Sequence, residues 1–192
     1  MLDQEAAQEQ VLTAAERLFY AEGVQAVGMD KVRSASGVSL KRLYQLFPSK
    51  EVLVLAFLRR RDTRWREALA NYVDGHALPD ERILAVFTWL HEWFSEADYR
   101  GCAFINSFGE LGGVSPDVAE QARHHKKAFR DYLAGLVAAA GRPAELADHL
   151  TLLAEGAMTT AAIAGTPEPA RQAQDAARRL MDTFGKAVQS GK

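Results

Sequence analysis

The feature that most constrains the fold is a helical periodicity that is interrupted only near glycine or proline. In the first expected helix, Val11, Ala15 and Leu18 recur at spacings of three and four residues, which places them on one face. No stretch alternates apolar and polar residues with the β-branched side chains that strands favour. Good helix formers such as alanine, leucine and arginine are abundant instead. The sequence therefore predicts an all-α fold of about nine helices.

Glycine, proline and capping residues set the expected ends of these helices. Gly23 ends the first helix, Gly37 begins a tight turn, and Ser39 caps the helix after that turn. Pro116 suits the first turn of a later helix, where its missing N–H costs no hydrogen bond. The expected helices span residues 4–22, 29–36, 39–45, 50–74, 80–97, 102–112, 116–140, 144–164 and 168–188.

The composition is typical of a soluble globular protein. Hydrophobic residues make up 48% of the 192 residues and charged residues 25%, enough to bury a core without cross-links. The single cysteine, Cys102, excludes an intrachain disulfide, and its role as a redox sensor or as a small buried residue stays open. The first ten residues are acidic and polar, unlike a signal peptide, and no apolar run approaches the roughly 18 residues of a membrane span. We expect a cytoplasmic protein with no membrane segment.

Charge is distributed unevenly along the chain. Residues 1–30 carry a net charge of −5, residues 31–66 carry +8, and the remainder carries −5, for a total of −2. No acidic residue stands between Lys31 and Lys50. A run of cations is often only a solvated helix face, but it also suits nucleic acid, whose phosphates attract lysine and arginine. The basic segment overlaps the motif described next, which favours the second interpretation.

Residues 28–47 have the pattern of a helix-turn-helix. Two short helices meet at Gly37, where a bulky or β-branched side chain is expected to block the turn. A small core can be supplied by Val32, Val38, Leu43 and Phe47, together with Leu18 and Phe19 of the first helix. The second helix presents a set of cations, hydrogen-bonding groups and apolar residues, namely Leu40, Lys41, Arg42, Tyr44 and Gln45. Such side chains suit phosphates and base edges in a major groove. From spacing alone, an ordinary pair of packed helices is the alternative.

These residues resemble the TetR family of transcriptional regulators. The first helix has the family's apolar-Ala-Ala-x-x-Leu-Phe pattern between Val11 and Phe19, and Gly-Val-Ser follows at residues 37–39. The sequence Leu-Tyr-x-x-Phe-x-x-Lys then runs over residues 43–50. The resemblance implies an N-terminal three-helix DNA-binding domain over residues 4–50. It also implies a helical ligand-binding and dimerisation domain over residues 51–192.

The resemblance further implies which residues contact DNA. They are Met29, Ser39, Leu40, Lys41, Arg42, Tyr44, Gln45 and Lys50. The Tyr44 hydroxyl and the Lys50 ammonium would each bind a phosphate, and Ser39 would cap the recognition helix. Two positions depart from the family pattern. Gly28 and Met29 stand where many relatives carry a hydroxyl, and Lys41–Arg42 replaces a pair of small residues, so the operator sequence cannot be inferred from relatives.

The middle of the chain, residues 80–135, is rich in aromatic side chains. The resemblance implies that the middle helices enclose an apolar ligand pocket. The candidate wall residues are Trp89, Trp93, Phe104 and Phe108, and the candidate polar anchors are His91, Asn106 and His125. An aromatic stripe at helical spacing is more often an ordinary core, and a single histidine is more often a structural residue, so both alternatives stay open.

The last two expected helices carry small residues along one face. In similar proteins the last two helices pair with those of a second copy in a four-helix dimer interface. The candidate interface residues are Ala157, Ala161, Ala164, Ala177, Leu180 and Phe184. Packing within one chain is the alternative. A two-fold homodimer would read a palindromic operator whose half-sites lie about 34–36 Å apart on double-stranded DNA.

Together these features predict a sequence-specific DNA-binding transcriptional regulator. The expected mechanism is a repressor that leaves its operator when a small, largely apolar ligand tilts the fourth helix and changes the spacing of the two DNA-binding domains. The alternatives to a repressor are an activator and a helical interaction protein that has lost DNA binding. The ligand, the operator and the regulated genes are not assigned.

Motifs for catalysis or for metal binding are not found in the sequence. It contains no glycine-rich phosphate loop and no HExxH motif. His124 and His125 are adjacent, so on a helix their side chains point about 100° apart and form a poor metal pair. We therefore expect no enzyme activity, no metal and no cofactor.

Overall fold

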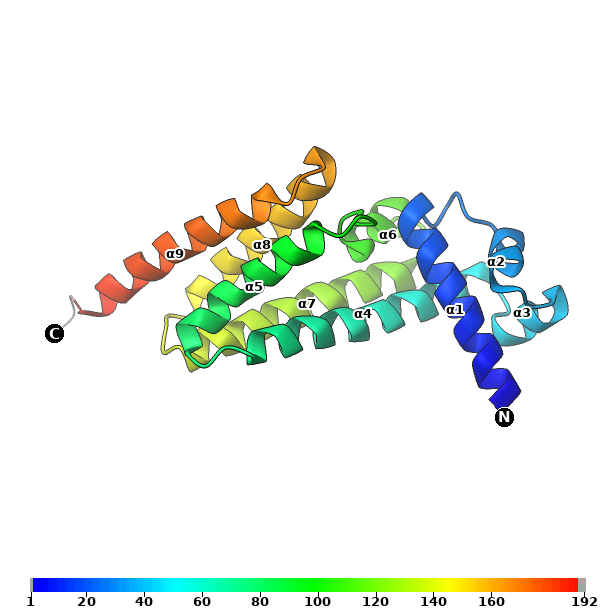
Figure 1. The fold of residues 1–192 in the computed structure, drawn as a ribbon, viewed down its shortest axis with the longest axis horizontal. Coiled ribbons are helices and arrows are strands. Elements are labelled where there is room, and N and C mark those ends of the chain that lie inside the picture. The colour runs from blue at the N-terminus through cyan, green and yellow to red at the C-terminus, as the bar shows by residue number, and fades with distance from the viewer. Residues whose placement is uncertain (1, 190–192) are drawn as a thin grey trace. The chain divides into compact units, whose positions relative to one another are not determined.

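The computed structural model describes residues 2–189, and the side chains of residues 4–185. Residues 190–192, the end of the second predicted domain, lie outside the described residues. Within the described range the chain forms nine α-helices and no strand, which confirms the predicted fold class. The helices are α1 (Leu2–Glu22), α2 (Met29–Ser36), α3 (Leu40–Leu46), α4 (Lys50–Asp74), α5 (Pro79–Phe94), α6 (Ala103–Leu111), α7 (Pro116–Ala139), α8 (Glu145–Ala164) and α9 (Glu168–Gln189). Figure 1 shows their order along the chain.

The end of α5 differs most from the prediction. The helix was expected to reach residue 97, but it stops at Phe94. The Ser95 hydroxyl donates a hydrogen bond to the His91 carbonyl at 2.7 Å, and the chain then turns. Tyr99 fixes this turn, because its ring packs on Phe94 and its hydroxyl donates to the Met158 carbonyl at 2.7 Å. A long-range tyrosine contact therefore ends a helix that local propensity would have continued.

Two compact units divide the chain. The first comprises residues up to Arg64 together with residues 103–125, and the second comprises residues 65–102 together with those from Lys126 onward. The predicted domain boundary at residue 50 coincides with the start of α4, whereas the first unit continues through the first half of that helix. The reason is that α1 packs against α4 residues such as Phe57, whose ring centroid lies 5.7 Å from that of Phe19.

The first unit has a continuous apolar core that holds the helix-turn-helix. Val32 of α2 and Leu43 of α3 have no exposed surface, and Phe47 is 3% exposed. The sequence predicted these residues for the small core, whereas Val38, which was predicted with them, is only half-buried. From α1 and α4, Val11 and Leu53 are also fully buried. Burial of such side chains contributes about 1.5–3 kcal/mol each, so the short helices α2 and α3 are held by packing and not by propensity alone.

In the second unit, α5, α8 and α9 pack side by side, as Figure 1 shows. Small side chains at their contacts are buried, with Ala154 and Ala177 fully inaccessible to solvent. Small residues let helix axes approach closely, which explains the alanine stripes in the sequence. No helix within residues 2–189 is both long enough and apolar enough to cross a membrane.

Candidate functional site

The turn between α2 and α3 depends on the backbone conformation of Gly37. Its φ of 72° is left-handed, and its N–H donates to the Arg33 carbonyl at 3.1 Å, which closes α2. A Cβ built on Gly37 would meet nothing within 4 Å. The space at the Cβ position is therefore open, and the backbone conformation supplies the reason for glycine. Other residues adopt a left-handed φ only at a cost.

Local capping sets the start of α3 as the sequence predicted. The Ser39 hydroxyl accepts a hydrogen bond from the Arg42 N–H at 3.2 Å, the geometry of a serine N-cap. At the start of α2, Gly28 has an extended backbone but no side chain to cap the helix. Ser49 repeats the serine cap at α4, where its hydroxyl accepts from the Val52 N–H at 3.2 Å. Serine caps thus fix where α3 and α4 begin.

One face of α3 is open to solvent. Leu40 is 47% exposed and Tyr44 is 46% exposed, while Leu43 behind them is fully buried. Lys41 and Gln45 are also exposed, and Arg42 is half-buried. The structure therefore brings the predicted DNA-contacting residues of α3 together on one surface. Ser39 is exposed just before this helix and Met29 is half-buried in α2.

The excess of positive charge in residues 31–66 is partly neutralised inside the first unit. Three arginines of α4 pair with two glutamates of α1: Arg60 with Glu9 at 2.6 Å, and both Arg61 and Arg64 with Glu16 at 3.2 and 3.3 Å. These arginines hold α4 against α1. The net charge of a sequence segment therefore overstated the charge that is available to a partner.

Lys41 and Arg42 carry the unpaired charge on the α3 surface. Within the part of the chain that the structure describes, neither has a carboxylate partner. They border a polar hollow of about 550 Å³. Its lining residues are Ala7, Gln10, Gly37, Val38, Ser39, Lys41, Arg42 and Gln45. Cations that are exposed and unpaired can bind phosphate without first breaking an internal ion pair.

The candidate pocket residues fall into two groups. In the second unit, Trp89 and Trp93 stack with ring centroids 5.7 Å apart, and both rings contact Trp65 edge-on. Phe129 contacts Trp65 in the same way at 5.3 Å. His91, on the same helix, is half-buried. Sequence reasoning missed Trp65 and Phe129 as members of this aromatic cluster, because they come from α4 and α7.

In the first unit, Phe104 and His125 are brought together. Their rings are stacked with centroids 3.8 Å apart, and both side chains are buried. His125 Nδ1 lies 2.7 Å from an oxygen of Asp62, which is also buried. By contrast, Phe108 is 49% exposed and Asn106 is exposed. Asp62 was missed, although an acid inside a strongly basic segment is a signal that could have been noticed.

Cys102 lies beside a half-buried lysine of the second unit, Lys126. Lys126 Nζ is 3.3 Å from Cys102 Sγ and 2.5 Å from an oxygen of Glu155. Desolvation lowers the pKa of Lys126, but its interactions with Cys102 and Glu155 outweigh this effect, so the pKa lies above its ordinary value. Among the described residues, no group of three or more histidine, cysteine, aspartate or glutamate side chains is arranged to hold a metal.

Tyr132 of α7 has an unusual environment in the second unit. Its hydroxyl is buried and has no hydrogen-bond partner among the described residues. Burial, with help from the Asp74 carboxylate, raises the pKa of Tyr132 to about 12. An unsatisfied buried hydroxyl is costly, so Tyr132→Phe is expected to raise the free energy of unfolding by about 1 kcal/mol, measured by urea denaturation at neutral pH.

The same variant has a predicted pH dependence. Because the folded pKa of Tyr132 lies above its ordinary value of 10, its contribution to stability is complete below pH 10 and is lost as the pH rises towards 12. Wild-type protein should therefore lose stability in this range faster than Tyr132→Phe. If the free energy of unfolding fell equally with pH in the two proteins, the raised pKa of Tyr132 would be contradicted.

The candidate interface residues of α8 and α9 lie on different faces. Ala157, Ala161 and Ala177 are buried within the chain, where they serve the packing of α8 against α9. Ala164 is exposed, and Leu180 and Phe184 are half-buried. Ala157, Ala161 and Ala177 thus pack inside the chain, the alternative that the sequence left open, whereas Ala164 does not.

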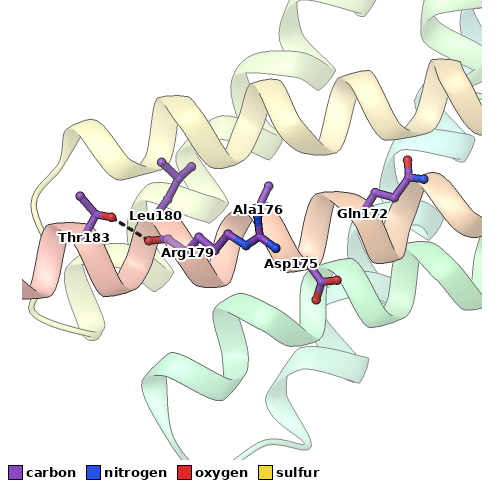
Figure 2. Close-up of a pocket in the computed structure, with 6 residues that line it drawn as sticks. All are labelled: Gln172, Asp175, Ala176, Arg179, Leu180 and Thr183. Carbon is purple, nitrogen blue, oxygen red and sulfur yellow. Dashed lines mark hydrogen bonds between the residues drawn. The ribbon is translucent and has the colours of Figure 1, made fainter.

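A second face of α8 and α9 remains uncovered within the chain. On α8, Leu152 is 71% exposed and Ile163 is 84% exposed. On α9, a hollow of about 520 Å³ is lined by Gln172, Asp175, Ala176, Arg179, Leu180 and Thr183. Figure 2 shows that all six come from this one helix, with the Thr183 hydroxyl donating to the Arg179 carbonyl.

Comparison with known proteins agrees with this geometry. Residues 11–57 match the family described as bacterial regulatory proteins, tetR family. An uncharacterised HTH-type transcriptional regulator of Mycobacterium tuberculosis is 33% identical over 84 residues, 44% of this chain and 42% of that protein. The HTH-type transcriptional activator FasR of Mycolicibacterium smegmatis is 33% identical over 132 residues, 67% of this chain and 57% of FasR. The chain thus spans about half the length of these curated relatives.

The likeness to a solved structure extends over nearly the whole chain. A TetR-family transcriptional regulator from Streptomyces coelicolor superposes with a TM-score of 0.83 at 26% identity, covering 94% of this chain and 96% of that one. The matched N-terminal segment contains the capped helix-turn-helix and its exposed α3 face. The family match, the shared fold and these relatives show that the chain belongs to the tetR family of bacterial regulatory proteins.

Proposed function

We propose that this protein is a sequence-specific, DNA-binding transcriptional regulator that acts in the cytoplasm. The observation that carries the proposal is the exposed face of α3, where Lys41 and Arg42 have no carboxylate partner among the described residues and Tyr44 stands beside them. Arg42 and Lys41 suit phosphates, and Gln45 has the hydrogen-bonding groups to read a base edge. Lys50, at the start of α4, donates one hydrogen bond to the Gln25 carbonyl at 3.3 Å, and an ammonium group has two further N–H donors for a phosphate.

We further propose that the protein acts as a homodimer. The occupant that best fits the uncovered face of α8 and α9 is a second copy, since Leu152 and Ile163 are large apolar side chains left in water by a single chain. Gly156 lies between them in sequence, and a Cβ there would meet nothing within 4 Å, so a partner helix could approach closely. A two-fold dimer presents two α3 helices, which matches a palindromic operator.

The proposed dimer interface can be tested by substitution. Changing Leu152 and Ile163 together to aspartate buries two charges in the proposed interface and is expected to raise the dimer dissociation constant by about 100-fold or more. Sedimentation equilibrium measures the change. Val114→Asp is the matched control, because Val114 is 78% exposed on the loop before α7, in the first unit. An unchanged dimer in the double variant would show that this face is not the interface.

We propose that a small, largely apolar ligand controls binding and that the protein is a repressor. The aromatic cluster of Trp65, Trp89 and Trp93 consists of the kind of apolar side chains that line pockets for such ligands. The sign of regulation depends on where the operator lies relative to the promoter. Since the relative FasR is named an activator, a reporter carrying the operator upstream or downstream of the promoter decides between repression and activation.

Operator selection tests the proposed function. Purified protein is mixed with random double-stranded DNA, and bound sequences are amplified and tested at several salt concentrations. We expect one palindrome to be enriched, with affinity that falls steeply as salt rises because bound phosphates release counterions. Enrichment of no sequence, with weak binding at every salt concentration, would leave the helical interaction protein as the better interpretation.

A further inference from the structure

A carboxylate of α6 holds the turn between α1 and α2. Glu110 Oε1 accepts a hydrogen bond from the Val24 N–H at 3.1 Å, and Oε2 accepts one from the Gln25 N–H at 2.6 Å. In return, the Gln25 side-chain amide donates to the Glu110 carbonyl at 2.6 Å. We call these three hydrogen bonds the Glu110 clasp. They join residues that are 85 and 86 positions apart in the sequence, and all of them lie within the first unit.

The turn is shaped to accept this carboxylate. Gly23 ends α1 with a φ of 91°, and its N–H donates to the Phe19 carbonyl at 3.0 Å. A Cβ on Gly23 would lie 3.0 Å from Glu110 Oε1, so a larger residue would push the carboxylate away. The left-handed glycine leaves two successive N–H groups directed at one anion. Hydrogen bonds to an ionised acceptor are stronger than neutral ones, so this is a specific attachment.

Side chains at the start of α4 and α7 join the same region. Lys50 Nζ donates to the Gln25 carbonyl at 3.3 Å, so the turn is bonded to α4 as well as to α6. The hydroxyl of Ser115 donates to Glu51 at 2.7 Å, which ties the first turn of α4 to the start of α7. The turn leads directly into α2, so its position determines where the helix-turn-helix begins.

A hollow that is open to solvent borders this junction. It measures about 290 Å³, and its apolar lining comes from Val24, Val54, Leu111, Val114 and Val118. Val24 and Val54 are nevertheless buried, so apolar packing also holds the turn. The Glu110 clasp adds directed hydrogen bonds to this packing and so specifies the orientation of the turn.

We infer that Glu110 is a positioning residue that fixes the orientation of α2 and α3 relative to α6, and thereby the separation of half-sites that the protein accepts. This inference rests on the proposed function, because half-site separation matters only for a dimer on DNA. The clasp would act without touching DNA. Its removal should loosen the placement of α3 while leaving the contacting side chains of α3 intact.

The first arm of the test measures the clasp without DNA. Hydrogen exchange at the Val24 and Gln25 amides is compared between wild type, Glu110→Ala and Glu110→Gln. We expect both amides to exchange at least about tenfold faster in Glu110→Ala, and less so in the glutamine variant, which keeps one acceptor oxygen. Glu120→Ala, which removes an exposed carboxylate of α7, is the matched control. Equally fast exchange in wild type would overturn the inference.

The second arm measures operator spacing. Wild type should bind the selected palindrome at least about tenfold more tightly than versions with one or two base pairs added between the half-sites. In Glu110→Ala this preference should fall below about threefold, while affinity for a single half-site stays within about twofold of wild type. An unchanged spacing preference in a variant whose amides are no longer protected would also overturn the inference.

The two arms separate failure of this inference from failure of the proposed function. If wild type enriches no palindrome, the proposed function fails and the spacing role fails with it, whereas the exchange data still decide whether the clasp exists. If Glu110→Ala does not fold, Gln25→Ala removes only the side-chain bond to the Glu110 carbonyl. That variant should show a smaller loss of spacing preference in the same direction, and no loss at all would contradict the inference.

Discussion

Replacing Lys41 and Arg42 together by alanine is expected to lower affinity for the selected operator by at least about 100-fold, because hydrogen bonds to charged groups contribute about 1.5–3 kcal/mol each. The slope of log affinity against log salt should also become shallower, by about two units per subunit, because the variant neutralises fewer phosphates and so releases fewer counterions. Fluorescence anisotropy at a series of salt concentrations measures both effects. The fold should be unaffected, because neither side chain is buried.

A matched control separates direct binding from a change in overall charge. Lys127→Ala with Arg130→Ala removes the same number of positive charges from exposed positions of the second unit. That variant should change operator affinity less than about threefold at physiological salt, where charges beyond about 8 Å are largely screened. Equal losses of affinity in the two double variants would show that Lys41 and Arg42 act through net charge and not by touching the DNA.

Changing Asp62 to alanine is expected to lower the free energy of unfolding by about 3 kcal/mol, the second large effect. Asp62 is 6% exposed and pairs with His125, which is 1% exposed and is stacked on Phe104. Removing the carboxylate leaves an imidazole without this partner in apolar surroundings. Urea denaturation at fixed protein concentration measures the decrease, since the stability of a dimer depends on concentration.

The reason for this decrease can be tested with two further variants. In a double-mutant cycle, Asp62→Ala should cost much less when His125 is already alanine, because the pair is then absent from both proteins. Asp131→Ala removes a half-exposed carboxylate that pairs with Lys127, and should cost less than about 1 kcal/mol. A decrease below about 1 kcal/mol for Asp62→Ala would mean that burial of this pair contributes little to stability.

The local features of the helix-turn-helix could be predicted because they depend on residues a few positions apart. The cap of α3 involves Ser39 and Arg42, and the turn before it needs only the backbone freedom of Gly37. The exposed position of Tyr44 follows from the same periodicity that buries Leu43. Short-range patterns of this kind also placed most ends of the helices within one or two residues.

Contacts between distant segments could not be predicted in the same way. Periodicity shows which face of a helix is apolar, but not which element covers it. The alanines of α8 illustrate the difference, because a stripe of small residues suits packing inside the subunit and packing against a partner equally well. In the folded chain α8 packs against α9, and Ala157 and Ala161 are buried.

The sequence by itself determined the all-α class, the position of the helix-turn-helix and the side chains of α3 that face solvent, because these follow from local propensity, capping and helical period. Only the tertiary structure decided which charges are free and which are used internally. Arg60 pairs with Glu9, Asp62 pairs with His125, and Glu110 binds the turn after α1. Such pairs form only where helices far apart in sequence pack together, and local propensity, capping and helical period do not determine which helices pack together.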